Sequence, residues 1–107
     1  MNSLYLELST SMLKALAHPT RIQILEHLKD QDELCVCHIY EELELEQSNV
    51  SQHLKILKDK GILTSRKKGL KVMYSVRFTE VFDILDLVKT ILSKQFKEAH
   101  EGLSGEE

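Results

Sequence analysis

The chain has 107 residues with a formal net charge of −3, and it is 42% hydrophobic and 29% charged, which is typical of one globular domain rather than several. It holds no run of about 18 apolar residues, which excludes a transmembrane helix, and residues 1–10 lack the basic and apolar stretches of a secretory signal. We therefore expect a cytoplasmic protein without a membrane partner, and a small domain that gains stability from self-association.

Four helices are predicted in the first 60 residues, from apolar residues at helical spacing. The first spans residues 4–17, and His18-Pro19 ends it, because proline disfavours helix in the residue before it. Gly61 is a natural stop for the fourth helix. The second, third and fourth helices are expected at about 19–29, 36–43 and 47–60.

After Gly61 the apolar spacing changes from that of a helix to that of a strand. Two short strands are predicted at 62–66 and 71–78, joined by a basic hairpin tip at 67–70. A last helix is expected at about 79–99, and the domain, residues 1–101, is followed by a polar tail at 102–107 that we expect to be disordered. This order predicts a mainly α fold of the α+β class, with about five helices and a two-stranded β-hairpin.

Basic residues are concentrated between Gln47 and Arg77. This segment holds eight Lys or Arg and one acid, a net charge of +7, whereas the rest of the chain carries −10. A basic stripe on an acidic body is typical of a protein that binds a polyanion. The alternative is a solvated, lysine-rich surface without a ligand.

The predicted helix at 47–60 has a face suited to DNA. At about 100° per residue, Val50, Leu54 and Leu57 share a core face, and the opposite side carries only uncharged polar and basic residues before Asp59. Such side chains bond base edges and phosphates. With the short helix before it, this helix predicts a helix-turn-helix whose second helix enters the major groove of double-stranded DNA, and we expect the hairpin tip to reach flanking phosphate or the minor groove. The candidate DNA-binding residues are Ser48, Asn49, Ser51, Gln52, His53, Lys55, Arg66, Lys67, Lys68 and Lys71.

Three stretches of the chain closely resemble the ArsR/SmtB family of metal-responsive repressors. They are ALAHPTRIQIL at 15–25, ELCVC at 33–37 and QSNVSQHLKIL at 47–57. The resemblance covers roughly residues 10–95. It implies a homodimeric winged helix-turn-helix repressor that binds an operator and leaves it when an inducer binds.

The last predicted helix supports a homodimer independently, because its apolar surface is wider than one small domain needs. Two adjacent stripes run along it, Val81, Leu85, Val88 and Leu92 on one and Ile84, Leu87 and Ile91 on the other. We expect a second copy to cover part of this surface, through the first and last helices of each chain. The alternative is burial of the whole surface within the monomer.

Cys35 and Cys37 are the candidate sensor. Thiolates bind soft ions such as As(III), Cd(II), Pb(II) or Zn(II), and folding requires none of them. His38 is the adjacent candidate for a third ligand, with Glu33 or a group of the partner subunit as further options. The family's arsenic sensors often place a third cysteine where this chain has Tyr40, so the chain departs from that pattern. We expect free thiols, because residues so close in sequence are a poor pair for a structural disulfide.

Several alternatives for the cysteines and for the chain stay open. One alternative is that the pair senses oxidants or reactive sulfur in place of a metal. Another is that both cysteines are small buried hydrophobic residues without a sensing role. A thiol enzyme is disfavoured, because the sequence has no Cys-x-x-Cys motif, phosphate loop or nucleophile–base set. A protein-interaction domain that does not bind DNA is the remaining alternative.

Overall fold

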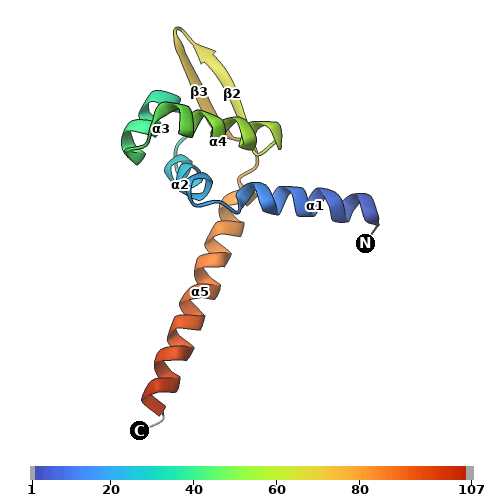
Figure 1. Ribbon diagram of the computed structural model, residues 1–107, viewed down its shortest axis with the longest axis vertical. Coiled ribbons are helices and arrows are strands. Elements are labelled where there is room, and N and C mark those ends of the chain that lie inside the picture. Colours follow the sequence, from blue (N-terminus) through green and yellow to red (C-terminus); the bar gives the residue numbers. More distant parts are fainter. Residues whose placement is uncertain (1, 106–107) are drawn as a thin grey trace.

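The computed structural model describes residues 2–105, which form five helices and a three-stranded antiparallel sheet (Figure 1). The elements in chain order are α1 (Ser3–Leu16), α2 (Pro19–Leu28), β1 (Leu34–Cys35), α3 (Val36–Leu43), α4 (Gln47–Asp59), β2 (Leu63–Lys68), β3 (Lys71–Val76) and α5 (Glu80–Gly105). The predicted mainly α architecture with a β-hairpin is therefore confirmed.

Local chemistry explains where the first two helices begin. The side chain of Asn2 caps α1 by accepting the backbone N–H of Tyr5 at 2.8 Å. His18 caps α2 in the same way, since its Nδ1 accepts the N–H of Thr20 at 3.1 Å. Pro19 is the first residue of α2, where its missing N–H costs nothing. The break between α1 and α2 lies where the sequence predicts it.

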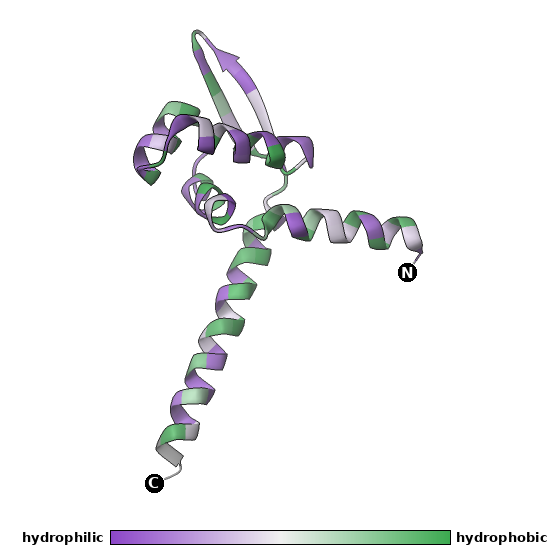
Figure 2. Ribbon diagram, in the orientation of Figure 1, coloured by the Kyte–Doolittle hydropathy of each residue, from purple (hydrophilic) through white to green (hydrophobic). Residues whose placement is uncertain are grey.

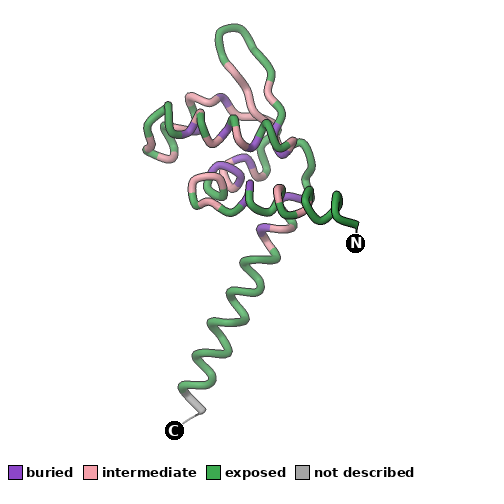
Figure 3. Tube along the Cα trace, turned by 45° about the vertical axis from the view of Figure 1, so that its right-hand side comes forward, coloured by how far each residue is buried: buried purple, intermediate pink, exposed green. Residues whose placement is uncertain are grey.

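A single core lies between α2, α3, α4 and the base of the sheet, and the end of α1 and the start of α5 pack into it. The predicted core face of α4 is confirmed, because Val50, Leu54 and Leu57 have no exposed surface. Ile24 and Leu25 of α2 are equally buried in the same cluster. Figure 3 shows the buried segments gathered in this body, whereas α1 and α5 are exposed along most of their length.

A tight turn fixes α4 relative to α3. Glu44 ends α3 in the left-handed conformation, with a φ of 54°, and its N–H bonds back to the carbonyls of Tyr40 and Glu41. The chain then enters α4 within three residues. The pair α3–α4 is thus the predicted helix-turn-helix, with α4 as its second helix.

The sheet contains one strand more than predicted. β2 and β3 form the expected hairpin, which we call the wing, and it closes at Gly69 with a φ of 64°. β1 pairs with β3 on the other side, with Leu34 opposite Tyr74 and Cys35 opposite Met73. The strand order β1-β3-β2 leaves β2 at an edge of the sheet.

The last helix is longer than expected. α5 runs from Glu80 to Gly105 and projects from the body as an arm (Figure 1). It continues through most of the stretch for which the sequence predicts a disordered tail, and residues 106–107 of that stretch lie outside the described residues. The division between domain and tail at residue 101 stays a prediction. Within residues 2–105, no helix has both the length and the apolar character needed to cross a membrane.

Candidate nucleic-acid interface and cysteine pair

The outer face of α4 presents polar side chains from a rigid support. Ser48, Asn49 and Gln52 are exposed, Ser51 is half-buried, and the opposite side of the helix is fully buried in the core. Lys55 is also exposed, and its Nζ lies 3.2 Å from Oδ2 of Asp59 one turn later. Because the buried side fixes the orientation of α4, the polar side chains keep a constant arrangement toward solvent.

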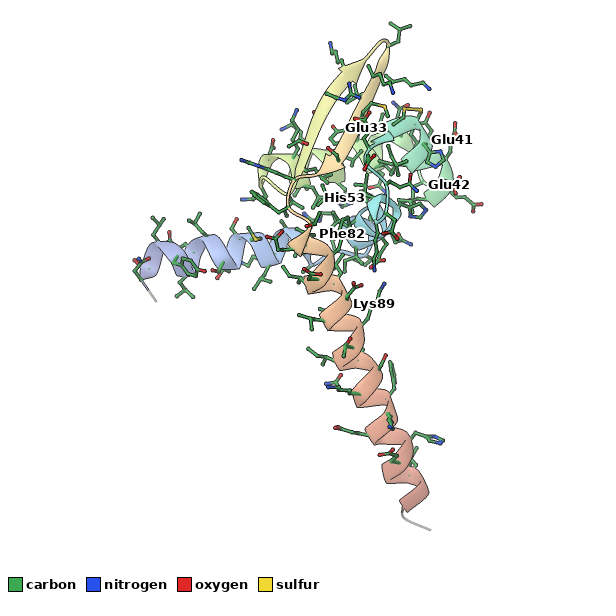
Figure 4. The ribbon with its side chains drawn as sticks, turned by 180° about the vertical axis from the view of Figure 1, so that it is seen from behind. Glu33, Glu41, Glu42, His53, Phe82 and Lys89 are labelled. Atoms are coloured by element: carbon green, nitrogen blue, oxygen red, sulfur yellow. A yellow bond between two sulfur atoms is a disulfide. The ribbon has the colours of Figure 1, made fainter. Side chains whose placement is uncertain are left out.

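His53 differs from the other candidate residues of α4, because its ring turns toward the interior (Figure 4). Its ring centroid lies 4.3 Å from that of His18. Its Nδ1 is buried without a hydrogen-bond partner among the described residues. Burial lowers the pKa of His53, and the neighbouring His18 and Arg21 lower it further. The structure therefore places His53 at the contact between α2 and α4 and not with the exposed candidates for DNA contact.

Three lysines surround the tip of the wing. Lys67 and Lys68 end β2, Lys71 begins β3, and all three are exposed on either side of the Gly69 turn. Figure 2 shows the hydrophilic colour concentrated on β2 toward this tip. The wing projects beyond α4 on the side of the body opposite to α5 (Figure 1), so the two sets of candidate residues belong to different elements of one surface.

Arg66 differs from the three lysines of the wing because it has an ion-pair partner, Glu33. Its Nε and Nη2 donate to the two carboxylate oxygens of Glu33, at 2.8 and 2.5 Å. This pairing lowers the pKa of Glu33, chiefly through the hydrogen bond from Arg66. No local pattern predicts the pair, because 33 residues separate its members. Two of the five N–H donors of Arg66 are thereby taken by Glu33, and the carboxylate offsets its positive charge.

Cys35 and Cys37 are joined by a disulfide bond, so the expectation of free thiols is wrong for this structure. The physical reason is the backbone between them. Cys35 ends β1 in an extended conformation and Cys37 lies in the first turn of α3, which separates their Cα atoms by 5.2 Å. That distance lies within the usual disulfide range of about 4.4–6.8 Å. Cys35 is buried and Cys37 is half-buried, so reagents reach the pair through Cys37.

The sulfur of Cys35 also caps α3. It accepts the backbone N–H of Cys37 at 3.2 Å, at the first residue before the helix. An N-cap acceptor satisfies one of the unpaired N–H groups with which every helix begins. Oxidation or reduction of Cys35 therefore changes the N-cap of α3, the first helix of the helix-turn-helix.

The predicted metal ligands do not form a metal site as they stand. A disulfide sulfur carries no thiolate, and thiolates are the form that binds As(III), Cd(II), Pb(II) or Zn(II). His38 is exposed and faces along its own helix, with Nε2 3.9 Å from Oε1 of Glu42. Between residues 2 and 105, no group of three or more His, Cys, Asp or Glu side chains is arranged to hold an ion.

Comparison with known proteins places these features among transcriptional regulators. The model of the family described as "Bacterial regulatory protein, arsR family" matches residues 18–65, from the start of α2 into β2. An HTH-type transcriptional regulator of Methanocaldococcus jannaschii is 39% identical over 77% of this chain and 92% of its own length. An arsenical resistance operon repressor of Staphylococcus xylosus is 40% identical over 80% of this chain and 84% of its own.

Solved structures agree with the sequence matches. The structure of reduced HlyU from Vibrio cholerae has a TM-score of 0.71 at 38% identity, and the match covers 79% of this chain and 88% of that one. A homodimeric winged helix-turn-helix DNA-binding domain from Mycobacterium bovis has a TM-score of 0.78 at 26% identity, over 90% of this chain and 88% of the other. Both matches extend beyond the helix-turn-helix to most of the chain.

Proposed function

The chain belongs to the ArsR/SmtB family of winged helix-turn-helix transcriptional repressors, and from this premise we propose that it is an operator-binding homodimer controlled by the thiol–disulfide state of Cys35 and Cys37. The homologues and the fold are those of DNA-binding regulators and not of enzymes. The single observation that carries the control by cysteine is the bond between the two sulfurs at the first turn of α3.

The proposed DNA contacts lie on α4 and the wing. The outer face of α4 enters the major groove, and the three wing lysines hold phosphates beside it. These side chains are exposed, apart from the half-buried Ser51, and this supports the assignment. The proposed contacts are Ser48, Asn49, Ser51, Gln52, Lys55, Lys67, Lys68 and Lys71. His53 and Arg66, which the sequence also suggests, are left out because they are engaged by His18 and Glu33.

The proposed dimer uses α1 and α5. Both helices leave large apolar side chains in solvent, among them Leu8 on α1 and Leu87 and Ile91 on α5. Contiguous apolar surface of this kind on a small protein is typical of an interface. The similar DNA-binding domain from Mycobacterium bovis is homodimeric, which supports a dimer for this chain. A two-fold dimer presents two copies of α4 to two half-sites.

The proposed switch is the closure of the disulfide by a peroxide. The two thiols of Cys35 and Cys37 lose two protons and two electrons and form the S–S bond. Hydrogen peroxide accepts them, its O–O bond breaks, and two water molecules leave. A dithiol reductant reverses the change by thiol–disulfide exchange. The similarity to HlyU from Vibrio cholerae in its reduced form supports regulation by oxidation state.

The reduced form is proposed to be the one that binds DNA. A Cys35 thiolate at the N-cap of α3 is a stronger acceptor for the N–H of Cys37 than a disulfide sulfur is, and the positive end of the helix stabilises its charge. Reduction thus stabilises the N-terminus of α3. This helix directly precedes α4 in the chain and supports it. Oxidation weakens this cap and lowers the affinity for the operator.

The test is binding to the DNA upstream of the protein's own gene. Fluorescence anisotropy gives the Kd of the purified protein after reduction by dithiothreitol and after oxidation by hydrogen peroxide, with thiols counted by alkylation and mass spectrometry. We expect the Kd to rise at least about tenfold on oxidation, a typical allosteric coupling, and to return on reduction. The variant Cys35→Ser with Cys37→Ser should bind DNA and ignore both reagents. A double variant that still responds like the wild type contradicts the assignment.

A thiophilic ion is the second candidate inducer, and the 40% identity to an arsenical resistance operon repressor favours it. It requires the reduced cysteines, with As(III), Cd(II), Pb(II) or Zn(II) as the ion. Adding each ion to the reduced protein bound to operator separates the two candidates. Release by arsenite without any loss of thiols to disulfide supports the ion, whereas release only by peroxide supports the redox switch.

A further inference from the structure

We propose that Glu33 is a positioning residue that transmits the state of the cysteine pair to the DNA-binding wing by holding Arg66. This inference rests on the proposed function, because it takes Cys35 and Cys37 as the sensor. It concerns a different question, namely which element of the DNA-binding surface the sensor acts on.

The sheet joins the sensor to the wing directly. Cys35 in β1 lies opposite Met73 in β3, and Met73 lies opposite Arg66 in β2. Cross-strand partners point to the same face of a sheet, so Cys35, Met73 and Arg66 form one row across its three strands. The sensor cysteine therefore lies on the same sheet as the wing, two strands away from the residue that Glu33 holds.

The Glu33–Arg66 pair spans this row with defined geometry. Two parallel hydrogen bonds of 2.8 and 2.5 Å fix the guanidinium plane against the carboxylate. The Glu33 side chain is 22% exposed, whereas that of Arg66 is 59% exposed, so Glu33 is the anchored partner. Figure 4 shows Glu33 between α3 and the wing.

The other ion pairs of residues 2–105 connect different parts. Lys29–Asp86 and Glu26–Lys89 join α2 and its C-cap to α5, and each of the other three pairs lies within a single helix, α3, α4 or α5. Within the described range, the Glu33–Arg66 pair is thus the ion pair that connects the cysteine segment to the wing.

The consequence is a route from sulfur chemistry to the wing lysines. Glu33 directly precedes β1, and Cys35 ends β1. Opening or closing the bond from Cys35 to Cys37 changes the backbone at this end of β1, and Glu33 moves with it. Because Arg66 is one residue before Lys67 on β2, the change reaches the phosphate contacts. Among residues 2–105, Glu33 forms no ion pair with a residue of α4.

The experiment compares wild type with Glu33→Gln, which keeps the shape of the side chain and removes its charge. The readout is the ratio of operator Kd values in the peroxide-oxidised and dithiothreitol-reduced states, with thiol counting and thermal unfolding on the same samples. Because the Cys35 cap of α3 remains in Glu33→Gln, we expect the wild-type ratio of about tenfold or more to fall to about threefold in this variant, while the thiols still oxidise at the wild-type rate. A Glu33→Gln ratio equal to that of the wild type overturns the inference.

A matched control and a rescue separate coupling from folding. Glu26→Gln removes a carboxylate of similar exposure that pairs with Lys89, far from the wing, and should keep the wild-type ratio. Glu33→Arg combined with Arg66→Glu restores the pair in reverse and should restore the ratio even if Glu33→Gln folds poorly. If the reversed pair forms a stable protein whose affinity no longer depends on oxidation, the pair is not the carrier.

The outcomes also distinguish this inference from the proposed function. A wild-type Kd that is independent of oxidation contradicts the redox switch itself. A wild-type Kd that responds to oxidation, together with an unchanged ratio in Glu33→Gln, leaves the switch in place and overturns only the route through Glu33.

Discussion

The molecule divides into a compact body and two projecting helices. In the body, built from α2, α3, α4 and the sheet, large side chains such as Ile24 and Leu54 have no exposed surface. In the projecting helices α1 and α5, apolar side chains of similar size stay in contact with solvent, for example Leu8 at 60% and Leu87 at 61% exposure. Large apolar side chains are thus buried in one part of the chain and exposed in the other.

The difference shows which parts are stable without a partner. Burying a large apolar side chain contributes about 1.5–3 kcal/mol, and the body gains this contribution from its own core. In α1 and α5, Leu16 and Leu85 are buried in the same core, whereas the exposed apolar side chains make this contribution only when another surface covers the helix. The stability of the body should therefore depend little on protein concentration, whereas the state of the projecting helices should depend on it strongly.

The largest effect is expected from a cavity in the body. Leu54→Ala removes a fully buried side chain, and we expect it to lower the free energy of unfolding by about 2–5 kcal/mol. Urea unfolding at a fixed protein concentration measures the loss. Lys58→Ala, on the exposed side of the same helix, should stay within about 0.5 kcal/mol of the wild type. An equally small change in the free energy of unfolding for Leu54→Ala would contradict the distinction between the body and the projecting helices.

A charge on the exposed stripe of α5 should separate the dimer without unfolding the body. Ile91→Glu places a carboxylate in the proposed interface, and the loss of a second α4 should weaken operator binding by about 100-fold. Light scattering gives the oligomeric state. Ser93→Glu adds the same charge on the opposite side of α5 and should leave the dimer intact. If both variants remain dimers at low concentration, α5 does not form the interface.

Gln52→Ala should alter neither folding nor association, because its side chain lies on the exposed face of α4. If Gln52 makes a bidentate base contact, its loss reduces the preference for operator over a base-substituted site by about 1–3 kcal/mol. Lys67→Glu with Lys68→Glu is the contrasting variant. It should weaken binding to all sequences alike and flatten the dependence of Kd on salt. Equal weakening of both DNA sites by Gln52→Ala would place this residue on phosphate.

The smallest effect concerns acid and the body alone. Burial lowers the pKa of His53 in the folded chain below the unfolded value of about 6.5. The unfolded chain then binds more protons than the folded chain as the pH falls through that value, so stability decreases toward acid and is constant above it. Thermal unfolding at several pH values should show His53→Gln losing less stability in acid than wild type. His100→Gln, on exposed α5, should follow the wild type, and identical curves for all three would contradict the assignment to His53.

The helices of the fold are predictable because their signals are local. The caps, Pro19 and the apolar spacing lie within each helix or next to it, so α3 has the predicted bounds and α2 and α4 begin at the predicted residue. β1 is not predictable in this way. It has two residues, and its hydrogen bonds come from Met73 and Tyr74, about 40 residues later. A strand that depends on so distant a partner has no periodicity of its own to detect.

The same distinction applies to the candidate site. The polar face of α4 and the lysines of the wing follow from the sequence, since helical and strand geometry decide their exposure. The pairing of Arg66 with Glu33 and the contact of His53 with His18 depend on the tertiary packing of segments that are far apart in the chain. The Cys35–Cys37 bond depends on the junction between β1 and α3, and that junction exists only once β1 is recognised as a strand.

The position of β2 at the edge of the sheet has a consequence for solubility. A free edge is a template on which another chain adds a strand and begins to aggregate, and positive charge along it repels an identical edge. Lys67 and Lys68 lie on this strand, so the side chains proposed to hold phosphate also keep folded copies apart. Replacing them with valine would leave an uncharged edge on which another chain pairs. Glutamate removes the positive charge and still keeps a charge on the edge, so it is the substitution that tests DNA binding.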